Sequence, residues 1–161
     1  MDEKELLTKK LTLITMNDAQ ISTKDKPIIG TEALATCIGV LLYNEEKKLA
    51  IVAHIAPSSI EGIEKIFKII LDNKLHNENF KYLIIPGYYE EHYNTKELIE
   101  KHLSHFTPFK KDEIPDNAIK INRDYESKEF AFNASTGNFV TDKVYFGLDY
   151  QKINNKNNKL K

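Results

Sequence analysis

The sequence predicts a single α+β domain in which sheets and helices pack in layers. The chain has 161 residues, a length that suits one domain with a buried core of its own. Apolar runs of strand length are mixed with segments whose apolar residues have helical spacing. Strands and helices do not alternate regularly, which disfavours a doubly wound parallel sheet. We expect the domain to span residues 1–150, and the polar residues 151–161 to form a disordered tail.

Short strands dominate the first third of the chain. Residues 11–15 alternate apolar and polar side chains, which is typical of a strand, whereas the polar residues 17–27 predict a loop. Two continuous apolar runs follow, at residues 38–43 and 49–55. Only the polar residues 44–48 separate them, so we expect a hairpin of two buried strands.

Two helices and the remaining strands complete the expected order. Ser59 has the character of an N-cap, because apolar residues at helical spacing follow it as far as about residues 72–73. A capping-box pattern at residues 94–97 predicts a second helix over residues 95–105. Further strands are expected at residues 80–85, 118–122, 129–134 and 138–146.

Composition and charge narrow the function classes. The chain carries 23 basic and 24 acidic side chains, a formal charge of -1, and Arg123 is its only arginine. Nucleic-acid and membrane-surface binding depend on clustered positive charge, so we expect neither a nucleic-acid partner nor membrane insertion. The amino terminus is acidic and no apolar run reaches the ~20 residues that cross a bilayer. We therefore expect a cytoplasmic protein, with export that uses no cleavable signal left open.

The single cysteine can be interpreted in two ways. Cys37 is either a small buried apolar residue or a reactive thiol, and for a lone cysteine beside an apolar run the first is the simpler. The predicted hairpin, however, places Cys37 and His54 at the same edge of a sheet. A thiol beside an imidazole is a nucleophile with a general base. The Thr31 hydroxyl is close enough in sequence to orient the imidazole as a third group.

Thr31, Cys37 and His54 resemble, spacing included, the Thr–Cys–His constellation of the chemoreceptor glutamine deamidases of the CheD kind. The stretch Leu34-Ala-Thr-Cys37 and the threonine-glycine turn that ends at Gly137 also match that family. The resemblance implies sandwich-like mixed β-sheets with helices packed outside. It also implies a cysteine-dependent protein-glutamine deamidase whose partner is a protein carrying the target glutamine, a chemoreceptor or another protein. No cofactor is implied.

Further roles follow from the same resemblance. Backbone N–H groups of Thr36 and Cys37 are expected to hold the oxyanion. The family has glycine where this chain has Ala35 and serine where it has Thr36, so a positive φ at Ala35 would be strained. These departures leave two alternatives open: an inactive binding or regulatory protein, with a regulatory partner, and a toxin-like effector that deamidates a host protein.

Two other groups of residues have side chains suited to binding or metal ligation. Tyr88 and Tyr89 belong to a tyrosine-rich segment that suits a substrate-contact loop, although an exposed loop that packs its own rings is as good an interpretation. His102 and His105 lie three residues apart on the second predicted helix. Two imidazoles without further ligands do not make a metal site, so we expect no metal.

Overall fold

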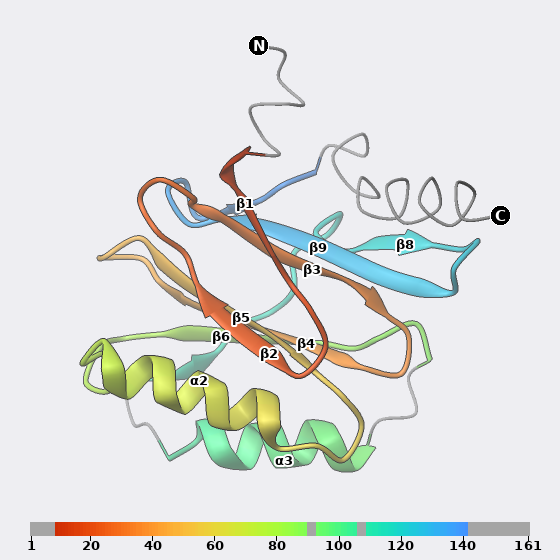
Figure 1. Cartoon of the computed structure of the whole chain (residues 1–161), viewed down its shortest axis with the longest axis horizontal. Helices are drawn as coiled ribbons and strands as arrows, with labels where there is room; N and C mark the ends of the chain where they lie inside the picture. The colour runs from red at the N-terminus through yellow and green to blue at the C-terminus, as the bar shows by residue number, and fades with distance from the viewer. Residues whose placement is uncertain (1–8, 90–92, 106–108, 142–161) are drawn as a thin grey trace, which may run out of the picture.

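A computed structural model of the chain describes residues 9–89, 93–105 and 109–141. Within these residues, ten strands form two mixed sheets and two helices cover the outer face of one sheet (Figure 1). The expected class, an α+β domain of layered mixed sheets with helices outside, is confirmed. The expected tail at 151–161 and the end of the last predicted strand lie outside the described residues. Neither helix in the described part of the chain is long and apolar enough to cross a bilayer.

The first sheet contains the strand that carries Thr31. Its order is β1-β3-β9-β10, with β8 also paired to β9. The β1–β3 pair is parallel and the other pairs are antiparallel. The strands are β1 (Leu11–Ile14), β3 (Ile28–Leu34), β8 (Lys120–Asn122), β9 (Ser127–Asn133) and β10 (Asn138–Phe139).

The second sheet contains the expected hairpin. Its order is β2-β5-β4-β6-β7, and only the β6–β7 pair is parallel. In the β4–β5 hairpin, Gly39 lies opposite His54 and Ile38 opposite Ile55. The strands are β2 (Asp18–Ile21), β4 (Ile38–Asn44), β5 (Leu49–Ile55), β6 (Lys81–Ile85) and β7 (Lys110–Lys111).

Helices α2 (Glu61–Asp72) and α3 (Tyr93–Leu103) lie on the outer face of the second sheet (Figure 1). The α2 residues Ile63, Ile66 and Ile70 are buried against that sheet. The expected N-cap is wrong by one residue, because Ile60 occupies the position and has no side-chain capping bond. The Ser59 hydroxyl instead accepts a hydrogen bond from the Glu61 N–H at 3.3 Å.

Three other expectations are corrected. The predicted loop at 17–27 contains β2, a polar edge strand that pairs with β5 through its backbone, and backbone pairing leaves no apolar pattern in the sequence. The two-residue strand β7 is too short to give a pattern. The second helix begins at Tyr93, so Thr95 is inside it. The Thr95 hydroxyl does not cap this helix but accepts a hydrogen bond from the Ser58 N–H at 3.1 Å.

Two apolar layers hold the domain together. One lies between the two sheets and contains Cys37, Val52 and Phe130, and the other lies between the second sheet and the helices. Strands β4 and β5 are buried on both faces, which is why their sequences are continuous apolar runs rather than alternating ones. The end of the layer between the sheets is where the sequence-predicted site residues meet.

Candidate active site

The three residues expected to act together come from three different segments. Thr31 lies on β3 of the first sheet, His54 lies on β5 of the second, and Cys37 lies in residues 35–37, which connect the two sheets. Figure 1 shows that the connection after β3, the connection after β6 and the β8–β9 turn lie at the same end of the sandwich. The site is therefore built across both sheets.

The hydrogen bonds of Thr31 determine the state of His54. The Thr31 hydroxyl donates to the Ile14 carbonyl oxygen at 2.7 Å and is also 2.7 Å from His54 Nδ1. A hydroxyl has one proton. Since that proton goes to Ile14, the oxygen must accept from Nδ1–H of the imidazole. The lone pair of the neutral ring is then on Nε2, where it is available as a base.

Cys37 and His54 lie on the same face of the second sheet. Side chains alternate along a strand, and Val52, two residues before His54, belongs to the layer between the sheets, as Cys37 does. His54 is paired with Gly39, two residues after Cys37. Cys37 directly precedes β4, and diagonal neighbours on one face of a regular strand pair have Cα atoms about 7–8 Å apart. This register places the two residues at the same end of the layer between the sheets.

Burial keeps both groups neutral. Thr31, Cys37 and His54 have exposed fractions of 0%, 6% and 4%. Burial lowers the pKa of His54 to about 4. Burial also raises the pKa of the Cys37 thiol, and the Thr36 hydroxyl offsets part of that rise. Among the described residues no hydrogen bond joins the thiol to the imidazole, and such bonds commonly tighten only when substrate is bound.

The connection that carries Cys37 has two notable backbone features. Within the described residues, no acceptor pairs with the N–H groups of Thr36 and Cys37. Two free N–H groups beside a thiol are the donors that an oxyanion needs. The strained residue of this region is Ala33, with φ 60°. Ala35 is not among the described residues with positive φ, so the strain expected at Ala35 is absent, because the β-bulge of β3 before Leu34 takes up the left-handed turn.

A second segment holds this connection in place. The N–H groups of Tyr88 and Tyr89 donate to the carbonyl oxygens of Leu34 and Ala35, at 2.9 and 3.0 Å. Gly87 packs so closely on the backbone of residues 35–37 that a Cβ at this position would clash with the carbonyl oxygens of Ala35 and Cys37. No sequence pattern marks this role of Gly87, because a close approach between backbones distant in the chain leaves no local signal.

The tyrosine pair lies beside the candidate nucleophile. The rings of Tyr88 and Tyr89 pack edge to face with centroids 5.2 Å apart. The Tyr89 hydroxyl donates to the Glu126 carboxylate on the β8–β9 turn, a contact between residues distant in sequence that no motif predicts. The rings pack on each other, as the second interpretation expects, while the backbone of both residues is bonded to the segment that carries Cys37. A role in substrate contact stays a prediction.

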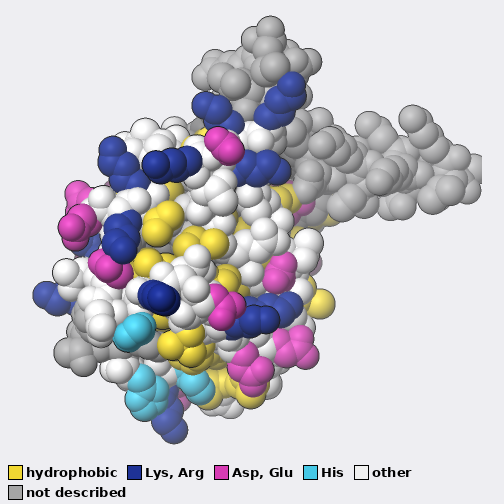
Figure 2. Space-filling model, turned by 60° about the vertical axis from the view of Figure 1, so that its left-hand side comes forward, with side chains coloured by type: hydrophobic (Ala, Val, Ile, Leu, Met, Phe, Trp, Pro, Cys, Tyr) yellow, Lys and Arg dark blue, Asp and Glu magenta, His cyan; other side chains and the backbone are white. Residues whose placement is uncertain are grey.

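The other histidines that the structure describes do not gather into a metal site. His102 Nδ1 lies 2.8 Å from the Leu98 carbonyl oxygen, and its ring packs near Phe67. Figure 2 shows the exposed histidine side chains on the lower part of one face, among acidic and basic side chains. In the described ranges no group of three or more histidine, cysteine or acidic side chains has the geometry of a metal site.

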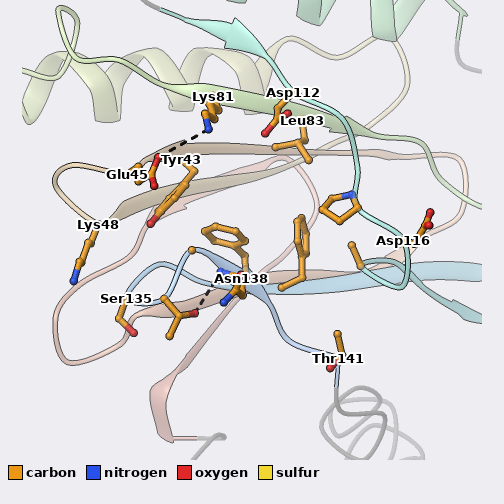
Figure 3. Close-up of a pocket in the computed structure, with 16 residues that line it drawn as sticks. Tyr43, Glu45, Lys48, Lys81, Leu83, Asp112, Asp116, Ser135, Asn138 and Thr141 are labelled. Atoms are coloured by element: carbon orange, nitrogen blue, oxygen red, sulfur yellow. Dashed lines mark hydrogen bonds and ion pairs between the residues drawn. The ribbon is translucent and has the colours of Figure 1, made fainter.

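A cavity of about 660 Å³ opens at the other end of the sandwich (Figure 3). Tyr43 and Phe132 line it, and Lys48, Lys81 and Asp112 are among the charged residues around it. Tyr43 is six residues along β4 from Cys37, a distance of about 20 Å in a strand. This cavity is therefore separate from the candidate active site.

Comparison with known proteins finds a match to one family model. A family model described as protein N-terminal asparagine amidohydrolase matches residues 8–126, a span that includes Thr31, Cys37 and His54. No curated protein matches the sequence. One similar solved structure is the hypothetical protein YfiH of Bacillus licheniformis, with 11% identity and a TM-score of 0.33. The match covers 70% of this chain and 40% of that protein.

Proposed function

Because the chain belongs to the protein N-terminal asparagine amidohydrolase family, we propose that it hydrolyses the side-chain amide of an amino-terminal asparagine, with Cys37 as the nucleophile. His54 is the general base and acid, and Thr31 orients it. A protein substrate follows from the family. The roles of the three residues are our assignment and rest on their geometry.

The first half of the reaction forms a thioester. His54 Nε2 takes the thiol proton while Cys37 Sγ attacks the amide carbon, and the N–H groups of Thr36 and Cys37 stabilise the oxyanion. As the C–N bond breaks, the imidazolium returns the proton to the departing nitrogen, which leaves as ammonia. The substrate is then bound to the enzyme through a C–S bond.

The second half consumes water. Nε2 accepts a proton from the attacking water molecule, the C–S bond breaks, and the proton passes to the sulfur. The net reaction converts an amide and water into a carboxylate and ammonium at neutral pH. Since a neutral side chain becomes an anion, the charge of the substrate's amino terminus changes.

The observation that carries this proposal is the hydrogen-bond chain from His54 through Thr31 to the Ile14 carbonyl oxygen. It fixes the imidazole in the tautomer that presents a basic nitrogen. Buried polar side-chain atoms in a purely structural role are in most cases hydrogen-bonded, and an unpartnered one calls for an explanation. Here Nε2 has no hydrogen-bond partner among the described residues and shares its face of the sheet with the only cysteine.

Glutamine in a protein is the second candidate substrate. The Thr31–Cys37–His54 spacing, which resembles that of the glutamine deamidases, favours it, and the same steps apply to either amide. A binding protein without turnover, and an effector that acts on a host protein, remain the further alternatives. The first two candidates differ in whether a free α-amino group is required.

One assay tests the function and separates the substrates. Purified protein is incubated with synthetic peptides that carry an amino-terminal asparagine, an acetylated amino-terminal asparagine or an internal glutamine. Ammonia release and a mass gain of about 1 Da are measured, because both report hydrolysis of the amide. We expect turnover of the free amino-terminal asparagine peptide and its loss in Cys37→Ala and His54→Ala.

The control is His76→Ala, which changes an exposed histidine and should retain wild-type turnover. Circular dichroism verifies that each variant is folded. Turnover that survives Cys37→Ala contradicts the nucleophile assignment, and turnover of the glutamine peptide alone would replace asparagine by glutamine as the substrate.

A further inference from the structure

Exposed apolar side chains gather at the end of the molecule that carries Cys37. Six large hydrophobic side chains are exposed within the described residues, and four of them lie on connections at this end: Met16 at 60%, Ile60 at 45%, Tyr89 at 42% and Tyr125 at 45%. Single exposed apolar residues are ordinary on protein surfaces. Four from separate connections around one buried nucleophile are more typical of an interaction surface.

Met16 and Ile60 lie beside His54. Met16 precedes Asn17, whose N–H donates to the His54 carbonyl oxygen at 2.8 Å. Ile60 is the residue before helix α2, and Gly62 in its first turn packs against Ile55. The connection that carries Met16 is thus bonded to the backbone of the base, and Ile60 lies at the start of the helix that covers the outer face of the same sheet.

Tyr89 and Tyr125 lie beside Cys37. The Tyr89 N–H binds the Ala35 carbonyl oxygen in the connection that carries the cysteine. Tyr125 precedes Glu126, which accepts the hydrogen bond from the Tyr89 hydroxyl. These two side chains thus belong to the connections after β6 and β8, whereas Met16 and Ile60 belong to the connections after β1 and β5. We call the four residues the apolar rim.

The charges at this end favour a positively charged occupant. Glu61 and Glu126 are exposed carboxylates next to rim residues Ile60 and Tyr125, and neither forms an ion pair among the described residues. The other exposed charges on the β8–β9 turn, Arg123 and Asp124, are opposite in sign and offset each other. An amino terminus carries an ammonium group at neutral pH. Opposite charge steers such a group toward the site before close contacts form.

We propose that the apolar rim is the docking surface for the amino-terminal segment of a substrate polypeptide, and that it selects large apolar side chains immediately after the target residue. The inference rests on the proposed function, because the target amide must reach Cys37. Each substrate side chain that packs on Met16 or Tyr125 removes apolar surface of both partners from water, which strengthens binding. Backbone geometry then fixes how far the amide extends toward the thiol.

Binding to the Cys37→Ser protein tests the rim without turnover. Two fluorescent peptides are compared by anisotropy, one beginning Asn-Leu-Phe and the other Asn-Ser-Ser, with the same lysine-free remainder. Met16→Ser and Tyr125→Ser are introduced separately. The matched control is Leu71→Ser, since Leu71 is 61% exposed but lies at the other end of α2, about 16 Å along the helix axis from Ile60.

We expect the Asn-Leu-Phe peptide to bind more tightly than the Asn-Ser-Ser peptide, and each rim substitution to weaken its binding by about five- to tenfold. Leu71→Ser should leave the affinity unchanged. Equal affinity for the two peptides, or an equal loss of affinity in Leu71→Ser, overturns the proposal that the rim is the docking surface. Failure of the proposed function has a different sign, namely turnover that persists in Cys37→Ala.

Discussion

A single hydroxyl group orients the imidazole at the candidate site. Thr31 is fully buried, and its oxygen serves both as donor to Ile14 and as acceptor for His54. Neither serine nor valine reproduces the whole side chain: serine keeps the hydroxyl and valine keeps the shape. These two substitutions therefore separate orientation of the imidazole from packing.

Thr31→Val should reduce turnover at least tenfold, because the imidazole loses the acceptor that fixes its tautomer. It should also lower the free energy of unfolding by about 1–3 kcal/mol, since a buried carbonyl oxygen and a buried N–H lose their partner. Steady-state kinetics and urea unfolding measure the two effects. Thr31→Ser should retain most of the turnover, and equal loss in both variants would contradict the orienting role.

Protonation of His54 should make stability depend on pH. Its pKa is about 4 in the folded protein, against an ordinary value of 6.5. Between these values the unfolded chain binds the proton and the folded protein does not, so the free energy of unfolding rises with pH across this window. The contribution is fully present above about pH 6.5, is lost as the pH falls toward 4, and amounts to about 3 kcal/mol.

Urea unfolding at several pH values from 4 to 7 tests the predicted pH dependence of the stability, with His54→Gln as the reference. Carboxyl groups titrate in both proteins, so the difference between the two curves isolates the imidazole. The wild type should lose more stability than His54→Gln as the pH falls. Parallel curves would show that His54 is not held neutral by burial.

At the scale of elements, residues 86–89 support the connection that carries Cys37. Two backbone hydrogen bonds and the close approach of Gly87 hold the connection at 35–37 against the end of β6. The left-handed conformation of Ala33 turns the chain at the end of β3 and costs roughly 1–2 kcal/mol. The position of the thiol is thus set by contacts between connections rather than by a regular element.

Gly87→Ala should abolish most of the turnover. Its Cβ would meet backbone oxygen atoms, which cannot move aside as a flexible side chain can, so the connection at 35–37 must shift. The free energy of unfolding should fall by about 1–3 kcal/mol. The measurements are turnover and chemical unfolding.

Gly62→Ala is the matched control for this change. The nearest atom to a Cβ at Gly62 is Ile55 Cγ1, at 3.0 Å, which belongs to a side chain that can adjust. Alanine also favours a helix over glycine by roughly 1 kcal/mol. We expect near-wild-type turnover. Similar losses in both alanine variants would mean that the site does not depend on the Gly87 contact in particular.

At the scale of the whole molecule, the site depends on how the two sheets are held together. Thr31 and His54 belong to different sheets, and their hydrogen bond crosses the apolar layer between them. Phe130 of the first sheet fills this layer, and a Cβ at Gly39 of the second would lie 2.8 Å from its ring. The distance between the two sheets therefore affects the Thr31–His54 hydrogen bond and with it the geometry of the site.

Phe130→Leu should reduce turnover more than its loss of stability explains. Ile66→Val removes a methyl group from the other layer, between α2 and the second sheet. Each should lower the free energy of unfolding by about 1 kcal/mol, but only Phe130→Leu should lower turnover. Turnover and urea unfolding are compared for both, and equal turnover would show that the site tolerates a shift between the sheets.

The sequence alone was sufficient for the fold class, the hairpin of β4 and β5, and the first helix. These elements have strong apolar patterns because they bury most of their side chains. It was insufficient for β2 and β7, which pair through the backbone and bury little. It also missed the exact starts of both helices: Ser59 bonds to Glu61 from one residue before the N-cap of α2, and Thr95 bonds to the distant Ser58 rather than capping α3.

For the site, the sequence determined which residues can do the chemistry: the only cysteine, a histidine two strand positions from it across a hairpin, and a threonine before it. Their catalytic roles remain predictions. The tertiary structure decided what no local pattern encodes. The carbonyl oxygen of Ile14 selects the imidazole tautomer. Gly87 packs on the backbone of residues 35–37, and Glu126 bonds to the neighbouring Tyr89. The four residues of the apolar rim come from four different connections. All of these features join segments far apart in the chain, which only the packing of the two sheets brings together.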